Sequence, residues 1–83
     1  MHRIIIERKA AKETECLPND IIQRIADAIK NLKFNPRPHG SKKLTGEVGW
    51  RVRIGDYRIL YTIDDSQKLI MIYRVKHRKE AYR

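Results

Sequence analysis

The sequence has little that could cross-link the chain or carry it into a membrane. Its single cysteine, Cys16, excludes an internal disulfide bond and is typical of a reducing compartment. The longest apolar runs, Ile4–Ile6 and Leu69–Ile72, are too short to span a bilayer, and the N-terminus lacks the apolar segment of a signal peptide. We therefore expect a cytoplasmic protein without a membrane partner.

Acidic residues are scarce as well. The 83 residues include 10 Asp and Glu against 19 Lys and Arg, which gives a net charge of +9. We expect a chain of this length to form one domain. So large an excess of positive charge on one small domain predicts an anionic partner, such as a nucleic acid, an acidic protein or an anionic surface.

The chain also lacks the usual motifs of metal, cofactor and nucleophile sites. No Gly-rich phosphate loop is present, and the serines, Ser41 and Ser66, have no nucleophile-elbow context. The cysteine and the histidines have none of the spacings of recognised metal sites; these histidines are His2, His39 and His77. We therefore predict no metal ion and no cofactor.

The clearest pattern that is present runs from Gly49 to Tyr61. Apolar and basic residues alternate along Trp50–Ile54, and an apolar-rich run, Tyr57–Ile63, begins after Gly55 and Asp56. Alternation with a period of two, and a two-residue break that begins with glycine, predict a β-hairpin with a tight turn. The predicted pairs are Ile54 with Tyr57, Arg53 with Arg58, Val52 with Ile59, Arg51 with Leu60, and Trp50 with Tyr61.

This pairing gives the hairpin one apolar face and one basic face. Directly opposed residues project to the same side of a sheet, so Arg51, Arg53 and Arg58 share the face opposite the core. Arginines opposed across a ladder destabilise it by a few tenths to about 1 kcal/mol. Because the guanidinium group matches the geometry of phosphate, we interpret the three arginines as an anion site rather than as a solvated basic face.

Around this hairpin the sequence predicts a two-layer α+β domain, with an N-terminal strand and a helical hairpin packed on an antiparallel sheet. The apolar spacing of three, four and three at Ile22, Ile25, Ile29 and Leu32 is typical of an amphipathic helix. The expected elements are a strand over His2–Glu7, a weak helix over Arg8–Leu17, a helix from Pro18-Asn19-Asp20 to near Lys33, the hairpin, and a last strand over Lys68–Val75. The facing of that last strand stays open, because one residue more or less in the preceding turn exchanges its two sides.

Two further segments are basic. The segment Asn35–Gly46 is a long predicted loop that contains Arg37, Lys42 and Lys43, and it is either a solvated connector or a ligand contact. The tail places His77, Arg78 and Tyr82 after the last strand, which a meander would put beside the strand that carries Arg58. An imidazole, a guanidinium and a phenol there suit a ribose-phosphate, although such a tail is often merely basic.

Two stretches together resemble the RelE/ParE superfamily of bacterial and archaeal toxins. The first is L-x₁₁-L-T-G-x₃-W-R-V-R-I-G-D-Y-R-I-L-Y from Leu32 to Tyr61, and the second is V-K-H-R-K-E-A-Y from Val75 to Tyr82. The resemblance covers essentially the whole chain. It implies a RelE-like toxin of a type II toxin–antitoxin system, which cuts mRNA in the ribosomal A site through the 2′-hydroxyl and without a metal. It also implies a cognate antitoxin as partner in a hetero-oligomer.

The resemblance also assigns roles by position. Arg51 and Arg53 match a basic pair, Arg58 and Arg78 match phosphate-binding arginines, and Tyr82 matches a tyrosine that orients or stacks on the base. The best-known members have lysines where this chain has Arg51 and Arg53, and arginine does not readily accept a proton. His77 or Tyr82 is therefore the candidate proton acceptor.

Two other functions fit the same resemblance. A ParE-like toxin would inhibit DNA gyrase by binding it and would cleave nothing, and a degenerate member would only bind an acidic partner. We favour the nuclease because five candidate groups gather on adjoining elements, and we take Arg37, Lys42 and Lys43 as further RNA contacts.

Overall fold

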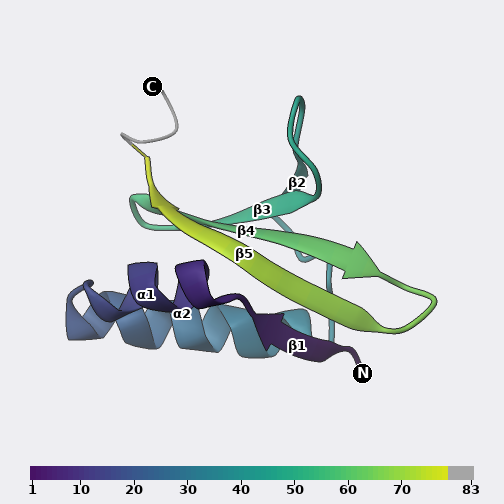
Figure 1. Ribbon diagram of the computed structural model, residues 1–83, viewed down its shortest axis with the longest axis horizontal. Helices are drawn as coiled ribbons and strands as arrows, with labels where there is room; N and C mark the ends of the chain where they lie inside the picture. Colours follow the sequence, from purple (N-terminus) through teal and green to yellow (C-terminus); the bar gives the residue numbers. More distant parts are fainter. Residues whose placement is uncertain (79–83) are drawn as a thin grey trace.

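The strands that the Gly55–Asp56 turn connects lie inside the sheet of the computed structural model, which describes residues 1–78. The strand order is β1-β5-β4-β3-β2, and both helices lie on one face of this sheet (Figure 1). The elements are β1 (Arg3–Ile6), α1 (Arg8–Glu15), α2 (Asn19–Leu32), β2 (Lys42–Lys43), β3 (Trp50–Ile54), β4 (Tyr57–Asp64) and β5 (Leu69–His77). The predicted two-layer α+β fold is confirmed.

The register of the central hairpin is the predicted one at every pair, from Ile54 opposite Tyr57 to Trp50 opposite Tyr61. Gly55 has a φ of 59°, which a residue with a side chain rarely adopts and which suits the first position of this tight turn. At the other end of β3, a Cβ atom on Gly49 would collide with the carbonyl group of Tyr61. Glycines at both ends therefore hold β3 in place against β4.

The sheet is mixed, whereas the sequence predicts an antiparallel sheet. The strands β2 to β5 are antiparallel, but β1 joins the free edge of β5 in parallel, with Arg3 opposite Leu69 and Ile6 opposite Ile72. The segment that we expected to be one long loop, Asn35–Gly46, contains the short strand β2. Two paired residues are too few to show a period of two in the sequence.

The core lies between the helices and the inner face of the sheet. The stripe on α2 is buried at Ile25 and Leu32, each 1% exposed, and it packs against Ile59, Tyr61 and other fully buried strand residues. Leu60 is also buried, but its pairing places it on the opposite face, apart from this cluster. None of the helices in the described part of the chain is long and apolar enough to cross a membrane.

A β-bulge in β5 decides the facing that the sequence leaves open. Leu60 pairs with Arg74, whereas the next residue, Tyr61, pairs with Ile72, so that Tyr73 is an extra residue on β5. Val75 comes three residues after Ile72, so strict alternation would place these two side chains on opposite faces. The bulge instead keeps Ile70, Ile72 and Val75 on the core side. Strand β5 ends at His77, two residues beyond the predicted end.

Helix α1 is attached to β5 through the carboxylate of Glu13, at the part of the β5 edge that lies beyond the end of β1. The carboxylate oxygens of Glu13 accept hydrogen bonds from Nε and Nη2 of Arg74, at 2.7–3.1 Å, and from the backbone N–H of Val75 at 2.9 Å. Burial raises the pKa of Glu13, but these hydrogen bonds and the charge of Arg74 outweigh it and leave the pKa below its ordinary value. Glu13 thus replaces a neighbouring strand at this edge.

Truncation of the α2 stripe tests the core. We expect Ile25→Ala to lower the free energy of unfolding by about 2–5 kcal/mol, because the side chain is fully buried and its removal leaves a cavity. Ile5→Ala is the matched control, since Ile5 is 44% exposed and should lose much less. Denaturant titration measures both, and equal losses would show that α2 does not contribute the core.

The Glu13 contacts predict a dependence of stability on pH. Because the folded-state pKa of Glu13 is lowered, its contribution is complete above the unfolded-state pKa of 4.5 and is lost as the pH falls through the folded-state value. At neutral pH, Glu13→Gln should therefore lower the free energy of unfolding by about 1–3 kcal/mol. The difference from wild type should shrink in acid. The exposed control, Glu15→Gln, should show no such pattern.

Candidate functional site

A polar pocket of about 240 Å³ lies where the β3–β4 hairpin turns. Its lining residues come from β3, the turn, β4 and the residue after β5; they are Arg53, Gly55, Asp56, Tyr57, Arg58 and Arg78. Three of these six residues are arginines. The structure therefore brings together Arg53, Arg58 and Arg78, which the sequence predicts as site residues from three separate segments.

The positions of the arginines follow from strand pairing. Arg53 and Arg58 are direct partners across the hairpin, and Arg58 is in turn the partner of Lys76 on β5. Their neighbours Ile59 and Val75 are buried in the core, so this row projects from the opposite face of the sheet. That face has no helix upon it (Figure 1), and at its β5 side Nζ of Lys76 lies 4.0 Å from Oε1 of Glu47.

Arg78 is held against the turn by Asp56. The backbone N–H of Arg78 donates to the carbonyl oxygen of Asp56 at 2.7 Å, and Nη1 of Arg78 lies 3.7 Å from Oδ1 of Asp56. Both side chains are about two-thirds exposed, at 66% and 63%. An ion pair this exposed contributes little stability and can open when an anion binds Arg78.

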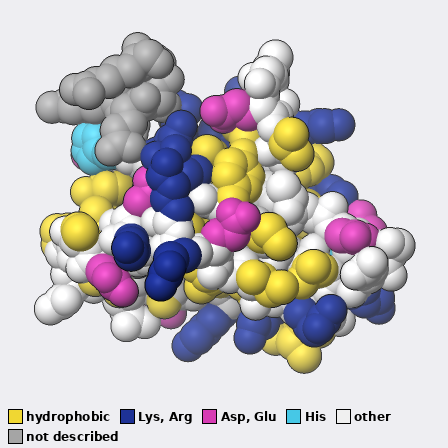
Figure 2. Space-filling model, in the orientation of Figure 1, with side chains coloured by type: hydrophobic (Ala, Val, Ile, Leu, Met, Phe, Trp, Pro, Cys, Tyr) yellow, Lys and Arg dark blue, Asp and Glu magenta, His cyan; other side chains and the backbone are white. Residues whose placement is uncertain are grey.

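A fourth arginine approaches the same turn from the helical layer. Nη1 of Arg24, on α2, would lie 3.4 Å from a Cβ atom added to Gly55. Figure 2 shows the wider setting: Lys and Arg side chains are spread over the visible face, with fewer Asp and Glu side chains among them. The local and the overall charge both favour an anionic ligand.

The predicted catalytic residue His77 is less closely placed. His77 is the direct partner of Tyr57 across β4 and β5, and its ring meets the Tyr57 ring edge-on, with centroids 5.1 Å apart and planes at 86°. Tyr57 lines the pocket, whereas His77 is not among the lining residues. Tyr82 lies outside the described residues.

Arg51 and Lys42 share the open face but lie further from the turn. They are partners of each other, and Arg51 also faces Leu60, one pair further along the face than the row of Arg53 and Arg58. Lys43 is the partner of Trp50 and therefore projects toward the other face. Of the predicted basic residues in this region, Lys42 and Arg51 extend the face of the pocket.

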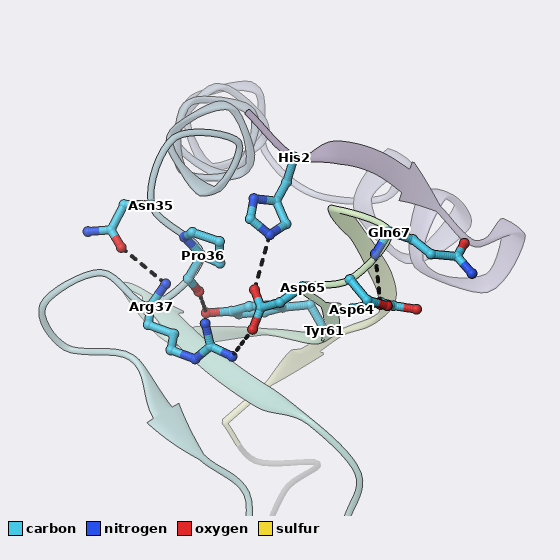
Figure 3. A network of polar contacts seen from close by, with 9 residues as sticks. His2, Asn35, Pro36, Arg37, Tyr61, Asp64, Asp65 and Gln67 are labelled. Atoms are coloured by element: carbon cyan, nitrogen blue, oxygen red, sulfur yellow. Dashed lines mark hydrogen bonds and ion pairs between the residues drawn. The ribbon is translucent and has the colours of Figure 1, made fainter.

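Arg37 takes part in a separate polar network at the far end of the hairpin (Figure 3). Its Nη2 donates to Oδ2 of Asp65 at 2.9 Å, its guanidinium lies 5.3 Å from the Trp50 ring centroid, and His2 contacts the other oxygen of Asp65 at 3.2 Å. Hydrogen bonds from Arg37 and His2 lower the pKa of Asp65. The structure does not bring Arg37 to the pocket, so its role in RNA binding stays a prediction.

The buried Tyr61 joins this network to the core. Its hydroxyl donates to the carbonyl oxygen of Pro36 at 2.7 Å and so fixes the segment that follows α2. Burial raises the pKa of Tyr61, against smaller opposing effects of a hydrogen bond with Ser41 and the charge of Arg37. A phenol that is buried and bonded in this way is structural, and it is not available to a ligand.

Sequence reasoning missed two polar residues of the pocket, Asp56 and Tyr57. The sequence identifies Asp56 only as half of a tight turn and Tyr57 only as an apolar-face residue. Lys76 was missed as well, because its facing depends on the β5 bulge. The available signal for Asp56 is its position: a turn residue between two arginine-bearing strands must lie beside both of them.

The chemistry of the pocket is that of an anion site. Guanidinium groups bind phosphate through paired hydrogen bonds and can stabilise a phosphorane that gains negative charge. Within residues 1–78, no group of three or more His, Cys, Asp or Glu side chains is placed to hold a metal ion. A larger groove of about 970 Å³, between β1 and the helices, is mainly lined by apolar side chains, and none of the three pocket arginines lines it.

Comparison with known proteins identifies the relatives of the chain. Residues 4–82 match the family described as the ParE toxin of the type II toxin–antitoxin system parDE. Toxin RelG of Mycobacterium tuberculosis is 35% identical over 77 residues, which cover 89% of this chain and 87% of that protein. Toxin RelE of the same organism is 31% identical over 88 residues, covering 99% and 87%.

A solved structure agrees with this result. The archaeal RelE–RelB complex from Pyrococcus horikoshii contains a chain that superposes on this one with a TM-score of 0.83 and 29% sequence identity. The match covers 93% of this chain and 94% of that chain. The RelE-like α+β architecture is therefore shared over nearly the full length of both.

The arrangement of the arginines predicts that the loss of one of them weakens ligand binding without lowering the stability of the fold. Arg53→Ala removes a repulsion with Arg58, so the melting temperature should stay unchanged or rise slightly. Binding of a single-stranded RNA oligonucleotide should weaken, and its salt dependence should lose one phosphate contact, about 0.7 in the log–log slope. Arg8→Ala, on α1, is the control. A large fall in melting temperature for Arg53→Ala would instead make these arginines structural.

Proposed function

The chain belongs to the ParE toxin family of type II toxin–antitoxin systems, and on that premise we propose that it is a ribosome-dependent endoribonuclease that cleaves mRNA codons in the A site. The observation that carries this proposal is the convergence of Arg53, Arg58 and Arg78 on one pocket. A module that only bound another protein would not need arginines opposed across a ladder. The names of the RelE relatives support the same assignment.

The proposed reaction needs only the RNA and the side chains of the protein. The 2′-oxygen of a ribose attacks the adjacent phosphorus, the bond to the 5′-oxygen of the next nucleotide breaks, and a 2′,3′-cyclic phosphate and a 5′-hydroxyl remain. The pocket arginines bind the scissile phosphate and stabilise the phosphorane. Arg51 and Lys42 contact the flanking RNA backbone, with Arg37 and Lys43 as more distant contacts, and Tyr82 orients or stacks on the base.

The toxin requires an antitoxin as its partner. One similar protein was solved as a RelE–RelB complex, and we propose that a cognate antitoxin likewise binds this chain in a hetero-oligomer. A net charge of +9 favours an antitoxin that presents acidic residues. We further propose that the 83 residues act as one toxin domain in the cytoplasm.

A second candidate is a toxin that binds DNA gyrase and cleaves nothing. The description of the matching family, which names the ParE toxin, favours it. The two candidates share a fold, so the fold does not separate them.

Translation in vitro with purified protein separates the two candidates. We expect mRNA cuts within codons, dependent on ribosomes, when the ends are mapped. Arg78→Ala should lower the rate by about 10²–10³-fold, because a group that stabilises the transition state is lost. Tyr82→Phe, which keeps the ring, should lower the rate only if the hydroxyl takes part. Antitoxin binding, which covers a larger surface, should weaken only modestly in both.

Other results would contradict the nuclease assignment. Intact mRNA together with inhibited DNA supercoiling would favour the gyrase-binding toxin. Undiminished toxicity in cells of both the Arg78→Ala and the Tyr82→Phe variants would also favour the gyrase-binding toxin, since neither residue would then be needed.

A further inference from the structure

The proposed reaction requires a group that takes the proton from the attacking 2′-hydroxyl. A positioned proton acceptor typically contributes 10²–10⁴-fold to such a rate. The arginines of the pocket stay protonated and cannot take this part. The sequence leaves His77 or Tyr82 for it. His77 contacts the Tyr57 ring but is not among the residues that line the pocket, and Tyr82 is outside the described residues.

Asp56 places a carboxylate in the same pocket as the arginines. Among the described residues that line the pocket, it is the one carboxylate, and it lies at the turn between the strands that carry Arg53 and Arg58. Its side chain is 63% exposed, so a ribose can reach it. A phosphate bound by the arginines would therefore lie beside a carboxylate.

The groups that face Asp56 from neighbouring elements are almost all cationic. In the pocket they are Arg53 from β3, Arg58 and Tyr57 from β4, and Arg78 after β5. Arg24 of α2 approaches the neighbouring Gly55, and His77 contacts the ring of Tyr57. Aspartate side chains are ordinarily ionised at neutral pH, and only that form accepts a proton.

The contact with Arg78 does not exclude this role. The two side chains lie 3.7 Å apart at Nη1 and Oδ1, beyond a good hydrogen bond, and both are exposed. A phosphate that binds Arg78 would replace the carboxylate as its partner and leave Asp56 available. The backbone hydrogen bond from Arg78 to the Asp56 carbonyl oxygen, at 2.7 Å, would meanwhile keep the two residues together.

We propose that Asp56 is the general base of this toxin, an inference that rests on the proposed ribonuclease function. Its carboxylate removes the proton of the 2′-hydroxyl as the 2′-oxygen bonds to phosphorus. The bond from phosphorus to the 5′-oxygen breaks, and that oxygen takes a proton from water in the open pocket. The hydroxide left behind removes the proton from Asp56, which restores the carboxylate.

The test compares Asp56→Asn and Asp56→Glu with wild type on ribosome-bound mRNA. The single-turnover cleavage rate is measured with saturating protein, and affinity is measured separately with an RNA that carries a 2′-deoxyribose at the cut site. Asp20→Asn, an exposed change in the first turn of α2, is the matched control. Thermal unfolding of each variant shows that it is folded.

We expect Asp56→Asn to lower the rate by about 10²–10⁴-fold. The affinity of this variant should be unchanged or tighter, because the pocket loses its negative charge. Asp56→Glu should recover part of the rate, because it restores a carboxylate, and Asp20→Asn should match wild type.

Two results would overturn the proposal while leaving the ribonuclease function intact. A rate for Asp56→Asn close to that of wild type would exclude Asp56 as the base and return the assignment to the tail. Weakened affinity, together with a rate as low for Asp56→Glu as for Asp56→Asn, would mean that Asp56 only positions Arg78. Wild-type protein that cuts no RNA would overturn both proposals, and this result is distinct because it needs no variant.

Discussion

Two residues, Gly55 and Asp56, connect β3 to β4, and the rest of the molecule depends on the register that this short connection imposes. With no spare residue in the turn, each hairpin side chain is assigned to one face. The apolar set faces the helices and forms the core, and the arginines face the other way. A slip of one residue would bury the arginines and expose the core, so the same constraint that stabilises the fold also positions the pocket.

The helical layer supports this arrangement without touching the open face of the sheet. The apolar side of α2 packs on the hairpin, and α1 is attached to β5 through the carboxylate of Glu13 at the edge that β1 leaves uncovered. Because β5 carries Arg78 to the turn, the attachment of β5 at its outer edge bears on the site. The repulsion between the opposed arginines lowers the stability of the sheet, and the packing on its other face offsets this loss.

Local pattern predicts much of this fold, and the remainder depends on contacts that pattern does not contain. The hairpin register follows from alternation and turn length, which are both local. The parallel pairing of β1 with β5 joins distant segments, β2 is too short to show a period, and the bulge at Tyr73 exchanges the faces of β5 without any mark in the sequence. The three arginines of the pocket follow from local pattern, so the sequence predicts them. The place of Asp56 in the pocket depends on contacts between distant segments, so the sequence identifies it only as a turn residue.

Binding of the RNA phosphate in the pocket at the β3–β4 turn is the step on which the proposed function depends. The most direct measurement is an NMR titration of the arginine Nε–Hε signals with a short RNA whose 2′-hydroxyl groups are methylated, so that it binds without being cut. We expect saturable shifts at Arg53, Arg58 and Arg78, while the signal of Arg37, held by Asp65, changes little. Shifts centred on Arg37, or shifts of equal size at all arginines, would contradict this expectation.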